Sequence, residues 1–253
     1  MRFIDLHSHL LPGIDDGSSS IVETVEMLRI AHRRGTRGIV ATPHAFQPMF
    51  ATHSLVALCG AFSRMMEQLQ DYSHYSEHSF LKEVDVYLGA ENLVSPEFLG
   101  ALERREVLAL NGSRYLLVEF PLSMAFPLAE SAVEQILERE LVPVLAHVER
   151  YEFCHQRPEC LEDLKRRGCV IQVNADSIGK GREDENSKLA VSLASQGVLD
   201  VIASDGHDAS ARPPEVQSAF DRLAKELSEE KLNTWMSENP SRILANQDLE
   251  SSE

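Results

Sequence analysis

Short apolar runs alternate along this chain with segments in which apolar residues recur every three or four positions. The first pattern is typical of buried strands and the second of amphipathic helices. We expect strands at seven apolar runs: residues 3–7, 38–42, 84–89, 115–118, 142–146, 170–173 and 198–203. We expect helices near residues 20–34, 54–72, 96–104, 128–140, 158–167, 184–196, 214–227 and 229–237. Strands that alternate with helices in this way indicate a parallel α/β fold.

Turn and capping residues support these boundaries. Serines at positions 18–20 are typical helix N-caps, and Gly35 ends the periodic segment that follows them. The chain has no low-complexity linker and no short repeat, so we expect a single domain over residues 1–253. The polar residues 247–253 are expected to form a disordered tail. The pattern alone does not separate a closed barrel from an open, doubly wound sheet.

The composition excludes several classes of protein. A formal net charge of −16 argues against binding to a nucleic-acid backbone, which requires clustered Lys and Arg. No apolar run is long enough for a membrane span, and the first residues lack the apolar region of a signal peptide. The four cysteines show neither a metal-binding spacing nor a disulfide framework, which favours a reducing, cytoplasmic setting. The oligomeric state stays open, a homo-oligomer included.

Histidines and carboxylates recur where the expected strands end. The first strand carries Asp5, His7 and His9 at alternate positions, which places the three side chains on one face. A turn with Asp15 and Asp16 follows. The later strand ends carry His44, Glu91, Glu119, His147, Asp205 and His207. In a parallel barrel the carboxyl ends of the strands meet on one face, where active sites lie.

The charges at these positions favour a metal site over isolated caps and surface histidines. Asp16, Glu91, Glu119 and Asp205 would bring four negative charges together, and unpaired carboxylates are costly to bury. Two or three divalent ions would offset this charge. Imidazole and carboxylate ligands suit such ions, and a cluster of three would be cationic enough to attract a phosphate.

Two arginines follow the histidines of the fifth and seventh strands. Arg150 lies three residues after His147, and Arg212 lies five residues after His207. Guanidinium groups bind phosphate oxygens through paired hydrogen bonds. We therefore expect both arginines to contact a phosphoryl group, with a surface ion pair as the alternative for each.

Cys160 and Arg166 have the Cys-x5-Arg spacing of cysteine-dependent phosphatases. That chemistry needs a loop of backbone N–H groups around the phosphate. The intervening residues 161–165 are acidic, helical in pattern and without glycine. A cysteine nucleophile is therefore not expected.

Six short motifs, in this order, resemble those of the PHP (polymerase and histidinol phosphatase) superfamily, and within it the bacterial tyrosine-protein phosphatases of the CpsB/CapC type. They are residues 5–17 (DLHSHLLPGIDDG), 41–44 (ATPH), 89–91 (GAE), 119–121 (EFP), 146–151 (AHVERY) and 204–207 (SDGH). The His-x-His pair is common by itself, whereas the LPGIDDG extension and the ordered set are specific. The resemblance covers nearly the whole chain and includes residues 239–244 (NPSRIL).

This resemblance implies an α/β fold, a distorted seven-stranded (βα) TIM-like barrel of the PHP type. It also implies a three-metal cluster, usually of Mn²⁺, although the ligand types admit Fe, Zn or Mg. The implied ligands are His7, His9, Asp205 and Glu91 for the first metal, Glu91, Glu119 and His147 for the second, and Asp16, His44 and His207 for the third. Arg150 and Arg212 would hold the phosphoryl oxygens, and Asp5 would orient an imidazole from behind.

The implied activity is metal-dependent hydrolysis of phosphotyrosine on a bacterial tyrosine autokinase that controls capsule or exopolysaccharide export. A histidinol-phosphatase-like enzyme for small molecules and a non-catalytic regulator that binds phosphotyrosine or a kinase are the alternatives.

One loop departs from the family pattern, because residues 45–50 (AFQPMF) are apolar where relatives often carry basic or further polar residues. This loop is expected to pack either on a substrate tyrosine ring or on the barrel.

Overall fold

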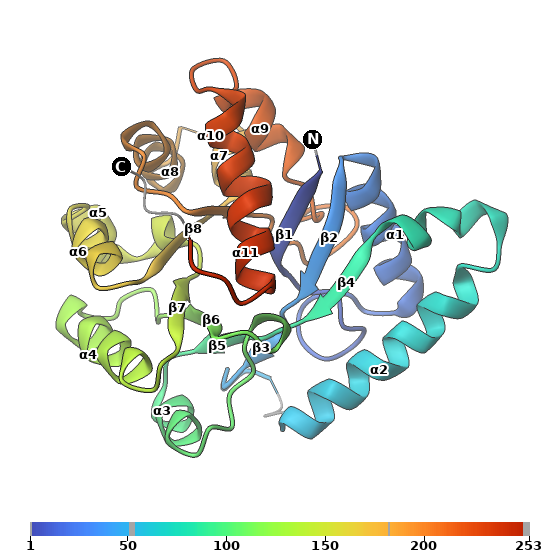
Figure 1. Ribbon diagram of the computed structural model, residues 1–253, viewed down its shortest axis with the longest axis horizontal. Coiled ribbons are helices and arrows are strands. Elements are labelled where there is room, and N and C mark those ends of the chain that lie inside the picture. Colours follow the sequence, from blue (N-terminus) through green and yellow to red (C-terminus); the bar gives the residue numbers. More distant parts are fainter. Residues whose placement is uncertain (1, 51–53, 182, 250–253) are drawn as a thin grey trace.

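The structure, a computed structural model, describes residues 2–50, 54–181 and 183–249. Parallel strands curl through its centre, and helices lie on the outer side of the sheet (Figure 1). The strands are β1 (Phe3–Ser8), β2 (Thr36–Ala41), β3 (His44–Ala45), β4 (Asp85–Leu88), β5 (Glu91–Leu93), β6 (Tyr115–Glu119), β7 (Val142–Leu145), β8 (Val170–Asn174) and β9 (Val201–Ala203). They pair in the orders β1-β2-β4 and β3-β5-β6-β7-β8-β9.

All seven expected strands are present, but the second and the third are each interrupted. The first interruption separates β2 from β3 at Pro43, which has no backbone N–H for the ladder. The second separates β4 from β5 at Gly89 and Ala90. Pairing resumes beyond both breaks, where His44 lies opposite Glu91. The second halves of these two strands therefore carry two of the expected site residues.

Hydrogen bonds between the first and last strands close the sheet on itself. Ser8 forms a parallel bridge with Gly206. The N–H of Asp205 donates to the carbonyl of His7 at 2.9 Å, and the N–H of His9 donates to the carbonyl of Gly206 at 2.8 Å. The result is a distorted, seven-stranded TIM-like barrel, which confirms the predicted fold class and decides against an open sheet.

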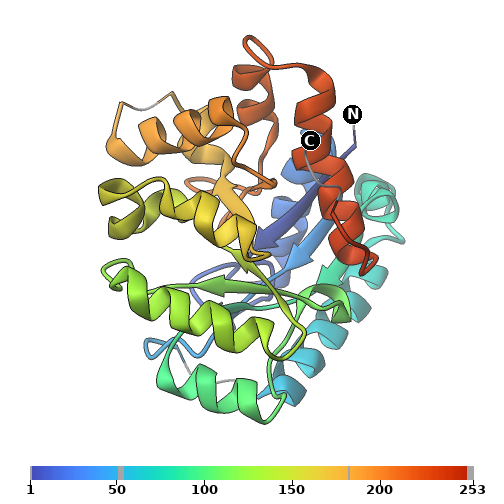
Figure 2. The same ribbon diagram turned by 60° about the vertical axis from the view of Figure 1, so that its left-hand side comes forward.

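The helices are α1 (Ile21–Arg33), α2 (Leu55–Tyr72), α3 (Pro96–Glu103), α4 (Phe126–Leu137), α5 (Glu152–Gln156), α6 (Cys160–Arg166), α7 (Ala175–Gly179), α8 (Glu185–Gln196), α9 (Gln217–Leu223), α10 (Glu229–Asn233) and α11 (Asn239–Leu244). Shorter turns are η1 (Ser76–Glu83), η2 (Leu110–Gly112), η3 (Val148–Arg150) and the π-helical η4 (Thr234–Glu238). Figure 2 shows the green to orange helices of the second half outside the strands. Among the described helices, none is both long and apolar enough to cross a membrane.

Most helix boundaries agree with the pattern, and the differences have local causes. The side chain of Ser20 caps α1 by accepting from the N–H of Glu23, as expected. Helix α4 begins before the expected residue 128 because Pro127 fits the first turn, where its missing N–H has no partner to lose. Helix α9 is shorter than the expected 214–227. The short helices α5, α7 and α11 were not expected, since six residues or fewer show little periodicity.

Alternate residues of the strands build two separate apolar layers. Leu117 of β6 belongs to a cluster inside the barrel, whereas its neighbour Val118 packs in the larger cluster under the outer helices. Ile243 of α11 belongs to the inner cluster. Helix α11 crosses in front of the strands in Figure 1 and so covers this core with the end of the chain.

The tail expected to be disordered from residue 247 is instead attached to the barrel over its first three residues. The hydroxyl of Tyr115 donates to the carbonyl of Gln247 at 2.6 Å. Arg114 forms an ion pair with Asp248, and Leu249 packs against the inner cluster. Residues 250–253 lie outside the described residues.

Candidate metal centre

A tight turn after β1 folds back onto His9 and presents two carboxylates. The N–H of Ser18 donates to the carbonyl of His9 at 2.9 Å, and the N–H of Gly13 donates to the carbonyl of Ser18 at 2.8 Å. Gly17 approaches so closely that a β-carbon on it would lie 2.3 Å from the β-carbon of His9. Only glycine permits this approach. The turn therefore holds Asp15 and Asp16 beside the end of the first strand.

The structure brings together the nine side chains expected to bind metal. They come from six strand ends and the first turn, and most are buried. Glu91 lies at the centre, with an imidazole nitrogen of each of four histidines within 3.4 Å of its carboxylate. These four are His7, His9, His44 and His147. Three of the remaining members contact these histidines, namely Asp16, Glu119 and Asp205. The last member, His207, contacts Asp16.

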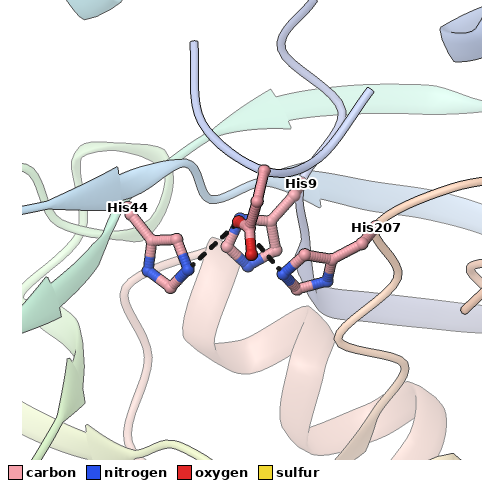
Figure 3. Close-up of side chains that lie close together, drawn as sticks. His9, His44 and His207 are labelled. Atoms are coloured by element: carbon pink, nitrogen blue, oxygen red, sulfur yellow. Dashed lines mark ion pairs between the residues drawn. The ribbon is translucent and has the colours of Figure 1, made fainter. Parts of the chain in front are cut away.

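The potential ligand atoms form three groups, and within each group these atoms lie within 4.8 Å of one another. One group consists of Asp16 and three histidines, His9, His44 and His207 (Figure 3). Oδ1 of Asp16 is 3.4 Å from the Nε2 atoms of both His44 and His207. The other two groups are His7, His9 and Glu91, and His44, Glu91 and Glu119. His9 and His44 each belong to two of these groups, whereas the family resemblance assigns each of them to one metal.

Asp205 and His147 contact these groups from the neighbouring strand ends. Oδ1 of Asp205 is 3.3 Å from Nε2 of His7, and Nε2 of His147 is 2.8 Å from Oε1 of Glu91 and 3.7 Å from Glu119. Asp205 and His147 both have positive φ angles, of 53° and 33°. Such angles cost energy in residues other than glycine, and they concentrate at functional sites.

Second hydrogen bonds orient several imidazoles so that Nε2 faces the cluster. Nδ1 of His9 is 2.7 Å from Oδ2 of Asp15, and Nδ1 of His207 is 2.8 Å from the carbonyl of Asp205. A histidine whose Nδ1 donates a proton keeps its lone pair on Nε2, which is the arrangement of metal-binding histidines.

Buried atoms without a hydrogen bond provide a test of metal binding. Among the described residues these include Nε2 of His7 and His9, Nδ1 of His44, and one oxygen each of Glu91 and Glu119. Buried polar atoms are normally hydrogen-bonded, so a cluster of unsatisfied nitrogens and oxygens needs another partner. Nitrogen and oxygen donors of this kind suit Mn²⁺, Fe²⁺, Zn²⁺ or Mg²⁺. The residues therefore fit a group of divalent ions.

The pKa values reflect the same crowding of imidazoles and carboxylates. Burial lowers the pKa of His44, but its contacts with Asp16 and Glu91 outweigh burial and raise the pKa to about 10. Burial and the charge of Glu91 raise the pKa of Glu119. Burial opposes ionisation of Asp205, yet the neighbouring His7 and His9 hold its pKa well below the ordinary value. Protons thus occupy positions in this cluster that cations would take.

Arg150 and Arg212 converge on one oxygen of Asp205. Nη2 of Arg212 lies 2.9 Å from Oδ2 of Asp205, and Nη1 of Arg150 lies 3.7 Å from the same oxygen. The loop that carries Arg212 is folded back, because the N–H of His207 donates to the carbonyl of Arg212 at 2.8 Å. Both guanidinium groups are partly exposed, at 36% and 42% of the side chain. They can therefore reach a ligand at the edge of the cluster.

The site also contains residues that the sequence pattern did not identify. Asp15 accepts from the backbone N–H of His44 at 2.9 Å in addition to its contact with His9. Gln172 and Asn174 of β8 reach the cluster through side-chain amides. Their alternation within β8 was a usable signal, since both lie on one face of that strand.

The expected role of Asp5 is wrong. Its carboxylate accepts from the backbone N–H groups of His7 and Ser204, at 3.3 and 2.9 Å, and contacts no imidazole through a hydrogen bond among the described residues. Asp5 thus fastens the first strand to the segment after β9. Gln172 takes the expected position beside the imidazole of His7.

The structure places Cys160 and Arg166 apart from any phosphate-binding arrangement. Cys160 is fully buried at the start of α6, within the outer apolar cluster. Arg166 is 75% exposed and forms an ion pair with Asp163 on the same helix. The two side chains therefore do not surround a phosphate.

In the apolar loop after His44, Phe46 takes the expected position on the barrel, and Phe50 packs on His44. The ring of Phe46 packs on Phe98 of α3 at a centroid distance of 5.7 Å, and so joins the apolar cluster under the outer helices. Phe50 instead stacks on His44, with centroids 5.2 Å apart and an interplanar angle of 12°. An aromatic surface therefore lies directly beside the candidate metal centre.

A parallel barrel with imidazoles and carboxylates clustered at the carboxyl ends of its strands is an architecture typical of barrel metalloenzymes. The chain belongs to the capsular polysaccharide synthesis CpsB/CapC family, whose sequence profile matches residues 3–245. Tyrosine-protein phosphatase CpsB of Streptococcus pneumoniae is 29% identical over 249 residues, which cover 96% of this chain and 99% of the relative. Tyrosine-protein phosphatase YwqE of Bacillus subtilis (strain 168) is 28% identical over 249 residues, covering 97% and 93%.

Solved structures support the same assignment. A crystal structure from a study of YwqE from Bacillus subtilis and CpsB from Streptococcus pneumoniae, described there as unique metal-dependent tyrosine phosphatases, has a TM-score of 0.87. It is 28% identical and covers 98% of this chain and 97% of its own. The phosphotriesterase homology protein from Escherichia coli has a TM-score of 0.58 at 10% identity, over 96% and 97% of the two chains. This second likeness concerns the fold alone.

Proposed function

We propose that this protein is a metal-dependent protein-tyrosine phosphatase with a cluster of three divalent ions, most suitably Mn²⁺. The observation that carries the proposal is the convergence of five imidazoles and three further carboxylates around Glu91, with unsatisfied buried nitrogens and oxygens. The proposed ligands are His7, His9, Asp16, His44, Glu91, Glu119, His147, Asp205 and His207. When bound, the ions would neutralise the charge of the carboxylates and lower the pKa of bound water to about 7.

The arginines are the proposed groups for binding and orienting the phosphoryl group. Arg150 and Arg212 approach Asp205 from the partly exposed edge of the cluster and can present paired N–H donors to phosphate oxygens. Such donors stabilise the charge that spreads over the equatorial oxygens in the transition state. The leaving phenolate has an ordinary pKa near 10 and needs little protonation. Water can therefore replace tyrosine without a covalent enzyme intermediate.

Phe50 favours an aryl phosphate over a small alkyl phosphate such as histidinol phosphate. Its ring stacks on His44, so a flat apolar surface adjoins the proposed phosphate position. A tyrosine ring gains from contact with such a surface, because aromatic pairs contribute about 0.5–1.5 kcal/mol beyond burial. In histidinol phosphate three alkyl carbons separate the ester oxygen from the imidazole ring, so that no ring lies next to the phosphate as it does in phosphotyrosine.

A bacterial tyrosine kinase that controls capsule or exopolysaccharide synthesis is the proposed substrate. The relatives named above are tyrosine-protein phosphatases, and the family is described by capsular polysaccharide synthesis. The four cysteines are free thiols, which fits a substrate in the reducing cytoplasm.

The direct test is turnover of a phosphotyrosine peptide by Mn²⁺-loaded protein, compared with histidinol phosphate. We expect the peptide to be hydrolysed faster. Activity should disappear with a chelator and in His7→Ala, and it should persist in Cys160→Ala. Faster turnover of histidinol phosphate would support the small-molecule alternative. Tight binding of the peptide without turnover in metal-loaded protein would support a regulator.

A further inference from the structure

Strand β8 carries no proposed metal ligand, yet two of its amides lie against the cluster. Gln172 is fully buried and Asn174 is 5% exposed. Oε1 of Gln172 is 2.9 Å from the backbone nitrogen of His147 and 3.4 Å from Nδ1 of His7. Nε2 of Gln172 donates to Oδ1 of Asn174 at 3.0 Å, and Nδ2 of Asn174 donates to Oδ2 of Asp205 at 2.8 Å.

One backbone group determines the orientation of both amides. The N–H of His147 can only donate, so the atom of Gln172 that faces it must be the oxygen. The NH₂ group of Gln172 then faces Asn174 and can only donate, which requires the oxygen of Asn174 to face Gln172. The NH₂ group of Asn174 is thereby left to donate to Asp205. The order of donors and acceptors along this path has a single solution.

This order sets the state of two proposed ligands. Because Oε1 of Gln172 only accepts, Nδ1 of His7 must carry its proton, and the lone pair lies on Nε2. Nε2 of His7 is the atom 3.4 Å from Glu91 and 3.3 Å from Oδ1 of Asp205. Asn174 occupies Oδ2 of Asp205, so Oδ1 is the oxygen that faces the histidines.

We propose that Gln172 and Asn174 are positioning residues of the metal centre, which select the Nδ1–H tautomer of His7 and reserve one oxygen of Asp205 for metal. The inference rests on the metal centre of the proposed function. His9 and His207 do not depend on these amides, since Asp15 and a carbonyl occupy their Nδ1 atoms. Partners of this kind contribute about ten- to a hundred-fold to metal affinity.

The test measures Mn²⁺ affinity of chelator-treated protein by titration calorimetry. Gln172→Met and Asn174→Leu should each weaken binding about ten- to a hundred-fold. Gln172→Glu keeps an acceptor for His7 and His147 and should lose less affinity than Gln172→Met. The control is Asn239→Leu, which removes another buried amide, one that donates to the carbonyl of Asp200 at 2.9 Å. This control should lower the Tm and leave Mn²⁺ affinity unchanged.

A second readout reports on the imidazole itself. In ring ¹⁵N NMR spectra of the Zn²⁺-loaded protein, His7 should carry its proton on Nδ1. This proton should exchange with solvent faster in Gln172→Met, which removes its acceptor, than in Gln172→Glu or Asn174→Leu, which both keep an acceptor at position 172. Wild-type affinity in both Gln172→Met and Asn174→Leu, or a proton on Nε2 of His7, would overturn the inference. Weakened Mn²⁺ binding in these variants, with no phosphotyrosine turnover by the wild type, would support the inference and refute the proposed function. If Gln172→Met does not fold, Gln172→Glu and Asn174→Leu decide the question.

Discussion

The backbone of Gly17 lies directly against His9, so close that a β-carbon on Gly17 would be 2.3 Å from both the β-carbon and the carbonyl oxygen of His9. The contact closes the first turn of the chain, which connects the strand carrying His7 to Asp16. His7 and Asp16 are both proposed metal ligands. A side chain at position 17 must therefore move one relative to the other.

We predict that Gly17→Ala reduces the Mn²⁺ content of the purified protein and its phosphatase activity. The matched control is Gly13→Ala in the same turn, where a β-carbon would have open space around it. Gly13 has a φ of 66°, so its replacement should cost only about 1 kcal/mol of stability. Metal analysis after gel filtration compares the two variants. Equal Mn²⁺ content in both would contradict the predicted effect.

Arg212→Met should lower kcat/KM for a phosphotyrosine peptide by about a hundred-fold, as expected for loss of a charge-stabilising donor. Arg212→Lys should restore little of this loss, because an ammonium group cannot bind two oxygens in the paired geometry of a guanidinium. Metal content must be measured in parallel, since Arg212 also contacts Asp205. A fully active Arg212→Lys enzyme would show that only the charge matters.

Mn²⁺ binding should release protons, and the apparent affinity should decrease as the pH falls. His44, with a pKa raised to about 10 by Asp16 and Glu91 against the effect of burial, holds a proton that a metal ion must displace. In the metal-free protein the same raised pKa stabilises the fold fully below the unfolded value of 6.5, and this contribution is lost as the pH rises through about 10. Calorimetric titrations in buffers of different ionisation enthalpy measure the released protons. Affinity that is independent of pH between about 6 and 8 would refute the competition.

Phe50→Ala should raise the KM for a phosphotyrosine peptide by roughly two- to tenfold, the loss expected for one aromatic contact. The neighbouring Met49 is 83% exposed, so Met49→Ala serves as the control and should leave KM unchanged. Turnover of an alkyl phosphate should respond to neither substitution. A uniform effect of Phe50→Ala on aryl and alkyl phosphates would indicate that Phe50 only supports His44.

The positions of the site residues followed from local patterns. His44, Glu91, Glu119 and His147 each lie at the end of an apolar run, and parallel strands necessarily bring their carboxyl ends to one face. The strands themselves were recognisable because burial on both faces selects nearly continuous apolar residues. Short helices such as α7 gave no such signal, since five residues contain less than two turns.

The sequence by itself determined the fold class and the set of side chains that gather at the site, because both depend on the order of strands and on which residues end them. Only the tertiary structure decided how these side chains are oriented. Gln172, Asn174 and Asp15 act through hydrogen bonds to residues brought close by the fold, and Asp5 holds the first strand to the distant segment that follows β9. Hydrogen bonds need donors and acceptors within about 3 Å and in line, and that geometry is set by packing across the barrel rather than by neighbours along the chain.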